Sequence, residues 1–266
     1  MVKPVRALVL AAGKSKRMKS EKSKVLLPIL GRTLIEYVVA ALEFEWIERI
    51  GLVVNENNIA EIKTVFGKRV DYILQPEQLG SAHAVMLAEP WSKNFSGSLV
   101  VVVGDGPFIN DNMVRMLIRQ QQQSDLAAVF LSAMYDSPPP YGRVVRDARG
   151  RVLRIVEEKD ATADEKKIKE VNSSHYCFDS KKLFPALARV NRMNAQNEYY
   201  LPDVIGILAH GGERVEAIPV DDPFLTFGIN TSEDLIAATR ELQQRIKRNV
   251  EQQGDPPGSP ARSYPD

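Results

Sequence analysis

A cluster of basic residues directly follows a short apolar segment near the start of the chain. Residues 5–11 are almost all apolar, which is typical of a buried strand in a parallel sheet. Gly13 then lets the backbone turn sharply, so that backbone N–H groups face an anion, and Arg17 and Lys24 add positive charge. The pattern indicates a phosphate-binding loop, with a solvated charged loop as the alternative. The basic residues of this segment are Lys14, Lys16, Arg17, Lys19, Lys22 and Lys24.

A carboxylate follows a second apolar segment. Residues 98–103 consist mostly of valine and predict a strand, and Gly104-Asp105-Gly106-Pro107 comes directly after it. A carboxylate at a sheet edge suits a hard divalent cation such as Mg²⁺, which prefers oxygen ligands and triphosphates. Asp before Gly is also a common turn pair, so a structural role for Asp105 is the alternative.

Strand and helix patterns alternate over the first half of the chain. This alternation predicts right-handed βαβ units and a three-layer, Rossmann-like α/β fold with a mixed, mostly parallel sheet. Ligands of such sheets lie beyond the carboxyl ends of the strands, where Gly13, Gln75 and Asp105 are expected. The predicted strands are 49–54, 70–74, 98–103 and 126–134, and the predicted helices are 33–45, 58–66, 79–89 and 110–123.

The alternation breaks after residue 140. A hairpin is predicted around Gly150, followed by a short helical segment and a further strand, and we expect this part to form a lid subdomain. The hairpin strands are 143–146 and 152–157, the helical segment is 163–168, and the strand is 170–178.

Composition allows one sizeable core and limits the partners. The 266 residues are 44% hydrophobic and 26% charged, which predicts one folded domain over 1–246 and, from the Gly and Pro content of the last residues, a disordered tail at 247–266. The net charge of +1 argues against nucleic acid or an anionic membrane as a partner. Cys177 is the one cysteine, so no internal disulfide can form, and we expect a cytoplasmic protein. No segment approaches the roughly 20 apolar residues of a membrane span.

Five ordered motifs together resemble the signature of the sugar-1-phosphate nucleotidyltransferase family. The resemblance covers about residues 5–245 and is greatest to the uridylyltransferase domains that act on N-acetylglucosamine 1-phosphate. No hexapeptide repeats are present, so an acetyltransferase activity like that of the bifunctional relatives is not predicted. The motifs are LAAGKSKRM with KVLLPI at 10–29, LQPEQLGSAHA at 74–84, VVVGDGP at 101–107, YGRVVRD with IVEEKDAT at 141–162, and FGIN at 227–230.

The resemblance implies roles for residues of the nucleotide side. Arg17 and Lys24 would be catalytic, and Asp105 and Asn230 would hold Mg²⁺. Asn230 read by itself belongs to the cap region of a helix that begins near Thr231. The implied nucleotide-binding residues are Leu10, Ala11, Ala12, Gly13, Gln75, Gly80 and Ser81, and serine at 81 keeps the hydroxyl of the family's threonine.

His83 has no role implied by the resemblance. It falls in the predicted helix at 79–89, and we interpret it as a packing or capping residue.

The sugar side matches the family less closely. The family reads Asn-Thr-Gly where this chain reads Asn172-Ser173-Ser174, followed by His175, and Pro202 replaces a threonine. These departures leave the identity of the sugar open. The residues that the resemblance implies for sugar binding are Gly142, Glu157, Asn172, Glu198 and Tyr200.

The resemblance predicts transfer of a uridylyl group from UTP to a sugar 1-phosphate. A phosphate monoester is mostly ionised at pH 7, so its oxygen needs no general base before it attacks the α-phosphorus. Positioning and charge neutralisation then do the catalytic work. N-acetylglucosamine 1-phosphate is the expected acceptor. The alternatives are another hexose 1-phosphate, dTTP or CTP as donor, or a catalytically weak nucleotide-sugar sensor on the same fold.

Overall fold

The computed structural model describes residues 3–13 and 23–253. The strands are β1 (Val5–Leu10), β2 (Pro28–Ile29), β3 (Arg32–Thr33), β4 (Ile47–Val54), β5 (Asp71–Leu74), β6 (Ser98–Val103), β7 (Ala128–Met134), β8 (Arg143–Arg146), β9 (Val152–Val156), β10 (Glu170–Asp179) and β11 (Val215–Val220). The helices are α1 (Leu34–Ala40), α2 (Ile59–Phe66), α3 (Ser81–Met86), α4 (Asp111–Gln123), α5 (Ser180–Leu187), α6 (Asp203–His210) and α7 (Ser232–Gln253). Short 3₁₀ turns are η1 (Lys24–Leu26), η2 (Glu165–Lys167) and η3 (Pro223–Thr226).

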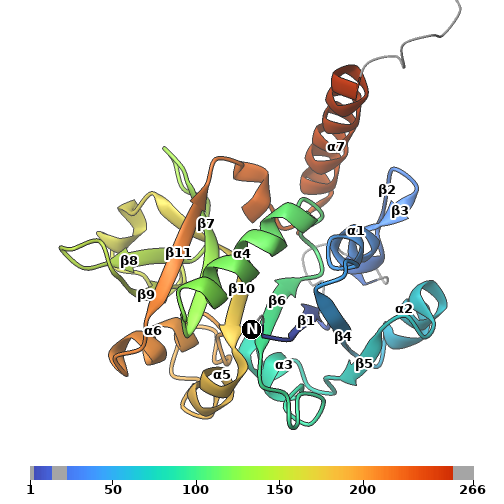
Figure 1. The fold of residues 1–266 in the computed structure, drawn as a ribbon. Helices are drawn as coiled ribbons and strands as arrows, with labels where there is room; N and C mark the ends of the chain where they lie inside the picture. Colours follow the sequence, from blue (N-terminus) through green and yellow to red (C-terminus); the bar gives the residue numbers. More distant parts are fainter. Residues whose placement is uncertain (1–2, 14–22, 254–266) are drawn as a thin grey trace, which may run out of the picture.

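One mixed sheet forms the centre of the molecule, with the strand order β11-β7-β10-β6-β1-β4-β5 (Figure 1). β1 pairs in parallel with both β4 and β6, and β4 pairs in parallel with β5. β10 runs antiparallel between β6 and β7. The carboxyl ends of β1, β5 and β6 therefore meet at one edge of the sheet, which is where the predicted ligand residues follow their strands.

Helices cover both faces of the sheet, which confirms the three-layer α/β fold. Alternate residues of β1 enter different cores because successive side chains of a strand point to opposite faces. Val5, Ala7 and Val9 pack in the core that contains α1, α2 and α4. Leu8 packs in the other core, which contains α3, α5 and α6.

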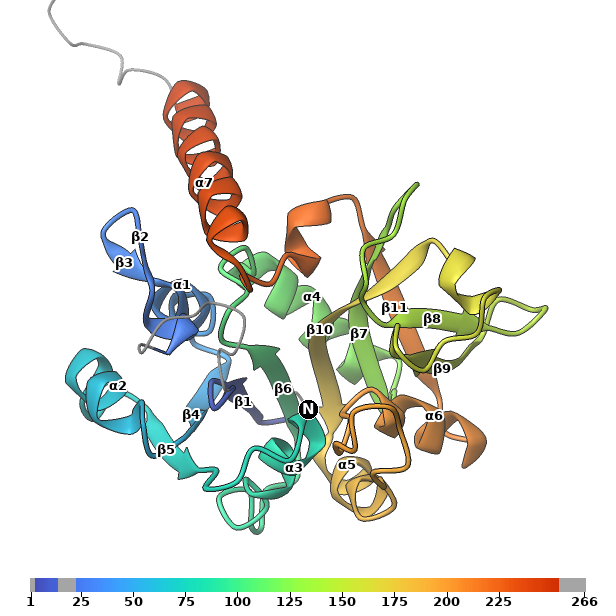
Figure 2. The same cartoon turned by 180° about the vertical axis from the view of Figure 1, so that it is seen from behind.

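Two parts extend from this body. The β8–β9 hairpin pairs with β10 through Val171 and Arg143 and so extends the central sheet, in the part of the chain where a lid subdomain was predicted. α7 packs through Ala238 and Leu242 against Phe108 and then projects away from the body in both views (Figure 2). None of the described helices combines the length and the apolar character that a membrane crossing requires.

The predicted strands and the first four helices are found, with bounds shifted by a few residues. The helical segment predicted at 163–168 is only the 3₁₀ turn at Glu165–Lys167. α7 continues to Gln253, so the first part of the segment predicted as a disordered tail is helical. Residues 254–266 lie outside the described residues.

Candidate active site

A cleft of about 960 Å³ opens at the carboxyl edge of the sheet, between the first strands, the β8–β9 hairpin and the start of α7. It brings together most of the residues predicted from the sequence, although their segments are far apart in the chain. Ala11 is buried and does not line the cleft, and Arg17 lies outside the described residues. The predicted residues that line the cleft are Leu10, Ala12, Gly13, Lys24, Gln75, Gly80, Ser81, Asp105, Gly142, Glu157, Asn172, Glu198, Tyr200 and Asn230.

Lys24, Asp105 and Asn230 meet in the middle of the cleft. The Lys24 ammonium forms an ion pair with Oδ2 of Asp105 and donates to Oδ1 of Asn230 at 3.1 Å. The Asp105 carbonyl oxygen also accepts from the N–H of Ile229 at 3.2 Å, which ties the two segments together. A carboxylate oxygen and an amide oxygen therefore converge on one cation, here the ammonium group. Such hard oxygen donors fit Mg²⁺, so these two side chains are suited to hold a divalent ion.

The helix that follows Asn230 is capped by other residues, and the Asn230 Nδ2 group donates to the Gly228 carbonyl at 3.0 Å instead. Thr231 Oγ1 accepts from the N–H of Asp234 at 3.1 Å, and Asp234 Oδ2 accepts from the N–H of Thr231 at 2.8 Å. Asp234 Oδ2 also accepts from the Asn230 N–H at 2.8 Å. This is a capping box, in which two side chains satisfy the first N–H groups of α7 reciprocally.

Two buried asparagines fix the loop after β1, and the sequence analysis missed both. Asn58 Nδ2 donates to the Ala11 carbonyl at 2.8 Å, and Asn55 Nδ2 donates to the Ala12 carbonyl at 3.0 Å. Because a peptide plane points its C=O and the next N–H in opposite directions, the N–H groups of Ala12 and Gly13 turn away from the asparagines. Neither N–H has a partner among the described residues. N–H groups in this arrangement are suited to bind an anion, as predicted for this loop, whose residues 14–22 lie outside the described residues.

The signal that identifies these asparagines is their position. Asn55 and Asn58 come directly after β4, which is the neighbour of β1 in the sheet. A polar pair that follows a buried parallel strand lies at the same edge as the loop that follows the adjacent strand.

Gln75 and Gly80 line one end of the cleft. Gly80 has φ 118°, and a Cβ at this position would collide with the backbone of Tyr199. Only glycine therefore allows the 198–201 segment to cross here. The Tyr199 N–H donates to the Leu79 carbonyl at 2.8 Å, and Ser81 Oγ accepts from the Leu201 N–H at 2.9 Å. The Ser81 hydroxyl thus links the start of α3 to the 198–201 segment.

Glu157, Gly142 and Asn172 line the cleft beside the β8–β9 hairpin and β10. A Cβ on Gly142 would lie 3.2 Å from Oε1 of Glu157, so glycine lets this carboxylate approach the backbone. The Asn172 amide is held by its neighbours, because Nδ2 donates to the Tyr176 hydroxyl at 2.6 Å and Oδ1 accepts from the Ser174 N–H at 3.1 Å. The remaining lone pairs of Oδ1 and of Glu157 are suited to sugar hydroxyl or amide groups.

The segment that departs from the family forms a bulge in β10. The register against β7 jumps between Asn172 and Tyr176, and Ser174 has a left-handed φ of 62°. Ser173 and Ser174 line the cleft, whereas the His175 ring is fully buried, close to Gly106. His175 therefore lies behind Gly106, which lines the cleft, and does not itself narrow it.

Ser174→Gly is expected to raise the free energy of unfolding by about 0.5–1 kcal/mol, because glycine adopts the left-handed conformation without a Cβ clash. Ser173→Gly is the control and should lower stability, since Ser173 is buried and has no positive φ. Urea denaturation of both variants checks this. A Ser174→Gly variant that is less stable than the wild type would show that the serine hydroxyl outweighs the backbone strain.

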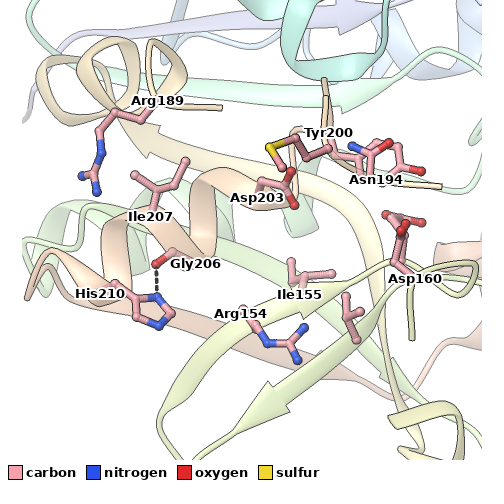
Figure 3. Close-up of a pocket in the computed structure, with 13 residues that line it drawn as sticks. Arg154, Ile155, Asp160, Arg189, Asn194, Tyr200, Asp203, Gly206, Ile207 and His210 are labelled. Atoms are coloured by element: carbon pink, nitrogen blue, oxygen red, sulfur yellow. Dashed lines mark hydrogen bonds between the residues drawn. The ribbon is translucent and has the colours of Figure 1, made fainter. Parts of the chain in front are cut away.

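A second cavity of about 450 Å³ is lined by Tyr200, Asp160 and Asp203 (Figure 3). It adjoins the first cleft, because Glu157 and Tyr200 line both. Burial, together with the negative charges of Asp203 and Asp160, raises the pKa of Glu157 to about 7. Burial and Asp160 raise the pKa of Asp203 to about 6. Near neutral pH the Glu157 carboxyl group can therefore either donate or accept a hydrogen bond.

The raised pKa of Glu157 predicts that the folded protein loses stability as pH rises. The folded state binds a proton at Glu157 up to about pH 7, whereas the unfolded chain releases it near its ordinary pKa of 4.5, so stability falls between these two values. Glu157→Gln is uncharged at every pH. The stability of Glu157→Gln relative to that of the wild type should therefore increase between pH 5 and 8, by on the order of 2 kcal/mol in the free energy of unfolding. Melting temperatures measured across this pH range check it.

The control for this prediction is Glu158→Gln, because Glu158 forms an ion pair with Lys166 at 3.3 Å and has no such burial. The stability of this variant relative to that of the wild type should not increase with rising pH. Parallel pH profiles for the wild type and Glu157→Gln would show that Glu157 is ionised in the folded protein over the whole range.

An α/β fold with a cleft in which the Lys24 ammonium lies between the Asp105 carboxylate and the Asn230 amide oxygen is that of an enzyme that transfers nucleotidyl groups. The chain belongs to the nucleotidyl transferase family, whose model matches residues 6–223.

Curated relatives agree with this assignment. The chain is 39% identical over 242 residues to the "Bifunctional protein GlmU" of Caldicellulosiruptor saccharolyticus, which covers 91% of this chain and 52% of that protein. It is 40% identical over 258 residues to the protein of the same name from Geobacillus sp., with 97% and 56% covered. The chain spans about half the length of the curated relatives it matches.

Proposed function

We propose that this enzyme transfers a uridylyl group from UTP to N-acetylglucosamine 1-phosphate, with Mg²⁺, and releases pyrophosphate. The observation that carries the proposal is the order of groups along one cleft. The strands of the sheet stand in the order β5, β4, β1, β6 and β10, and Gln75 follows β5, Asp105 follows β6, and Asn172 lies at the start of β10. This order matches a base, a phosphate chain and a sugar.

The phosphate chemistry needs charge neutralisation and positioning. An oxygen of the ionised sugar 1-phosphate attacks the α-phosphorus of UTP, and the bond from that phosphorus to the pyrophosphate oxygen breaks. Lys24 and the N–H groups of Ala12 and Gly13 stabilise the negative charge that develops on the phosphate oxygens. Mg²⁺ held by Asp105 and Asn230 would supply further neutralisation of the phosphates. Asn55 and Asn58 keep the loop N–H groups turned toward the substrate.

The sugar end supports an N-acetylated hexosamine. Ser173 and Ser174 add small polar groups to the wall, and the bulky His175 ring turns into the core. Room for the acetamido group therefore remains beside Glu157 and Asn172. A preference for glucose 1-phosphate by about tenfold in kcat/KM, worth about 1.4 kcal/mol, would overturn the sugar assignment and leave nucleotidyl transfer standing.

The experiment that tests the sugar end uses Glu157→Ala with UTP and N-acetylglucosamine 1-phosphate. The variant should raise KM for the sugar phosphate and leave UTP binding unchanged, because Glu157 follows β9 whereas Gln75 follows β5, the edge strand on the far side of β10 and β6. Mass spectrometry of the product identifies the nucleotide sugar. An unchanged KM for the sugar phosphate in this variant would remove Glu157 from the acceptor site.

A further inference from the structure

The buried side chain of Asn58 joins two stretches of the chain that lie at the cleft. Its Nδ2 donates to the Ala11 carbonyl at 2.8 Å and to the Ser23 hydroxyl at 3.1 Å. Ala11 comes directly after β1, and Ser23 comes directly before Lys24. One amide group therefore holds the start of the loop after β1 beside the residue that precedes the cleft lysine.

The neighbours of Asn58 leave its amide only one orientation. The Ala11 carbonyl can only accept a hydrogen bond, so the amide atom that faces it is the NH₂ group. The Asn55 N–H can only donate, and it lies 3.0 Å from Oδ1 of Asn58. The two bonds of the NH₂ group and the one of the oxygen hold a side chain that is 1% exposed. Rotation of this amide would leave buried polar groups unpaired, so its position is rigid.

The Ser23 hydroxyl bonds to Asn58 and does not cap the turn that follows it. Ser23 precedes η1, and a serine at such a position commonly accepts a backbone N–H through its hydroxyl, but no bond of this kind forms within the described residues. The Ser23 carbonyl accepts from the Leu26 N–H at 3.0 Å. The bond from Asn58 therefore fixes the residue at which η1 starts.

Lys24 is the first residue of η1, so the anchoring of this turn bears directly on the Lys24 side chain. Its ammonium group contacts Asp105 and Asn230 in the cleft. Residues 25–26 are buried and hold the turn against the core. Because apolar burial is non-directional, it does not by itself fix how the turn is rotated. A directed hydrogen bond at the start of the turn supplies that constraint.

We infer that Asn58 is a positioning residue that acts through Ser23 and sets the place of Lys24 relative to the loop after β1. The inference rests on the proposed function, in which Lys24 and the N–H groups of Ala12 and Gly13 neutralise the same phosphate chain. These groups can serve one phosphate chain only if their spacing is fixed. A displacement of about 1 Å in such a site can cost about 100-fold in rate.

The test compares kcat and KM for UTP, at saturating N-acetylglucosamine 1-phosphate, in the wild type and in variants of Ser23. Ser23→Ala removes the hydroxyl and should lower kcat about five- to tenfold, which corresponds to the loss of one hydrogen bond worth about 1–1.4 kcal/mol. KM for UTP should stay within about twofold, because Lys24 stabilises the transition state more than the bound substrate. Ser23→Thr keeps the hydroxyl and should keep kcat within about twofold. Asn57→Ala, which changes an exposed neighbour of Asn58, is the control and should leave both constants unchanged.

A double-variant cycle shows whether Ser23 and Asn58 act through their mutual bond. Asn58→Leu keeps nearly the volume of the asparagine and should lower kcat by at least as much as Ser23→Ala. In Asn58→Leu the hydroxyl has already lost its donor, so the addition of Ser23→Ala should lower kcat by less than about twofold more. A Ser23 hydroxyl that contacted the phosphates itself would instead give additive losses. Melting temperatures identify which variants are folded, and Ser23→Ala compared with Ser23→Thr decides the result if Asn58→Leu does not fold.

The outcomes separate this inference from the proposed function. A kcat of Ser23→Ala equal to that of the wild type, or additive losses in the double variant, would overturn the inference and leave the proposed function intact. A raised KM for UTP without a loss of kcat would also overturn it, since Ser23 would then be a binding group. A wild type that uses only another pair of substrates would contradict the proposed function, and the same comparison with that pair would decide the inference. No turnover of any pair would contradict both.

Discussion

Asp105→Asn is expected to lower kcat by at least about 100-fold at saturating Mg²⁺, with the fold retained. The Asp105 carboxylate is ion-paired with Lys24, which also contacts Asn230, so it supplies the one negative charge of this three-residue cluster. Asparagine keeps the shape and removes the charge that holds a cation against the phosphates. Loss of one such preorganised electrostatic group typically costs 10²- to 10³-fold in rate.

Steady-state kinetics with a Mg²⁺ titration, together with a thermal melt, test the Asp105 prediction. Asp111→Asn is the matched control. It is the same substitution at the start of α4, and Asp111 is not among the residues that line the cleft. The control should keep kcat within about twofold. Turnover of Asp105→Asn close to that of the wild type would remove Asp105 from the site.

Lys24→Met is expected to lower kcat by about 100- to 1,000-fold and to change KM for UTP much less. Negative charge builds on the leaving pyrophosphate, and a charge that interacts more strongly with the transition state than with the substrate affects rate rather than binding. Methionine keeps most of the length and the apolar stem of the lysine. Lys24→Arg keeps the charge and should retain part of the rate.

The double variant Lys24→Met with Asp105→Asn distinguishes a shared role from two separate ones. Because the two side chains form an ion pair, their effects should be less than additive in free energy. Fully additive losses would show that the pair does not act as a unit. A Lys24→Met variant that raises only KM for UTP would make the lysine a binding group.

Local sequence patterns predicted the part of the fold that depends on neighbouring residues. The alternation of valine-rich runs and amphipathic segments predicted β4 to β7 and α1 to α4, because strand and helix periods differ. The same reasoning placed Gly13, Gln75 and Asp105 at one sheet edge, where they line one cleft. The family suggested by the motifs was confirmed by the match over residues 6–223.

Pairing between distant segments could not be predicted in the same way. The insertion of β10 antiparallel between β6 and β7 depends on long-range contacts, and no local pattern specifies it. The left-handed Ser174 was also missed, since serine gives no local signal for positive φ. The start of the predicted tail was placed too early because Gly and Pro do not begin until residue 254, whereas the preceding charged and glutamine residues favour a helix.

The contact between the side chains of His83 and Gln75 was not predicted from the sequence. Both residues were visible in one motif, and the resemblance implied a role for Gln75 alone. Gln75 Nε2 lies 3.0 Å from Nδ1 of His83 and 3.3 Å from the Gly80 carbonyl oxygen, contacts that only the three-dimensional arrangement shows.

Pyrophosphate release from a panel of nucleoside triphosphates and sugar 1-phosphates tests the central claim most directly. UTP with N-acetylglucosamine 1-phosphate should give the highest kcat/KM, with one pyrophosphate released for each nucleotide sugar formed and with activity lost in Asp105→Asn. No pyrophosphate release above that of Asp105→Asn with any pair in the panel would contradict the account, because the cleft would then bind nucleotide sugars without making them.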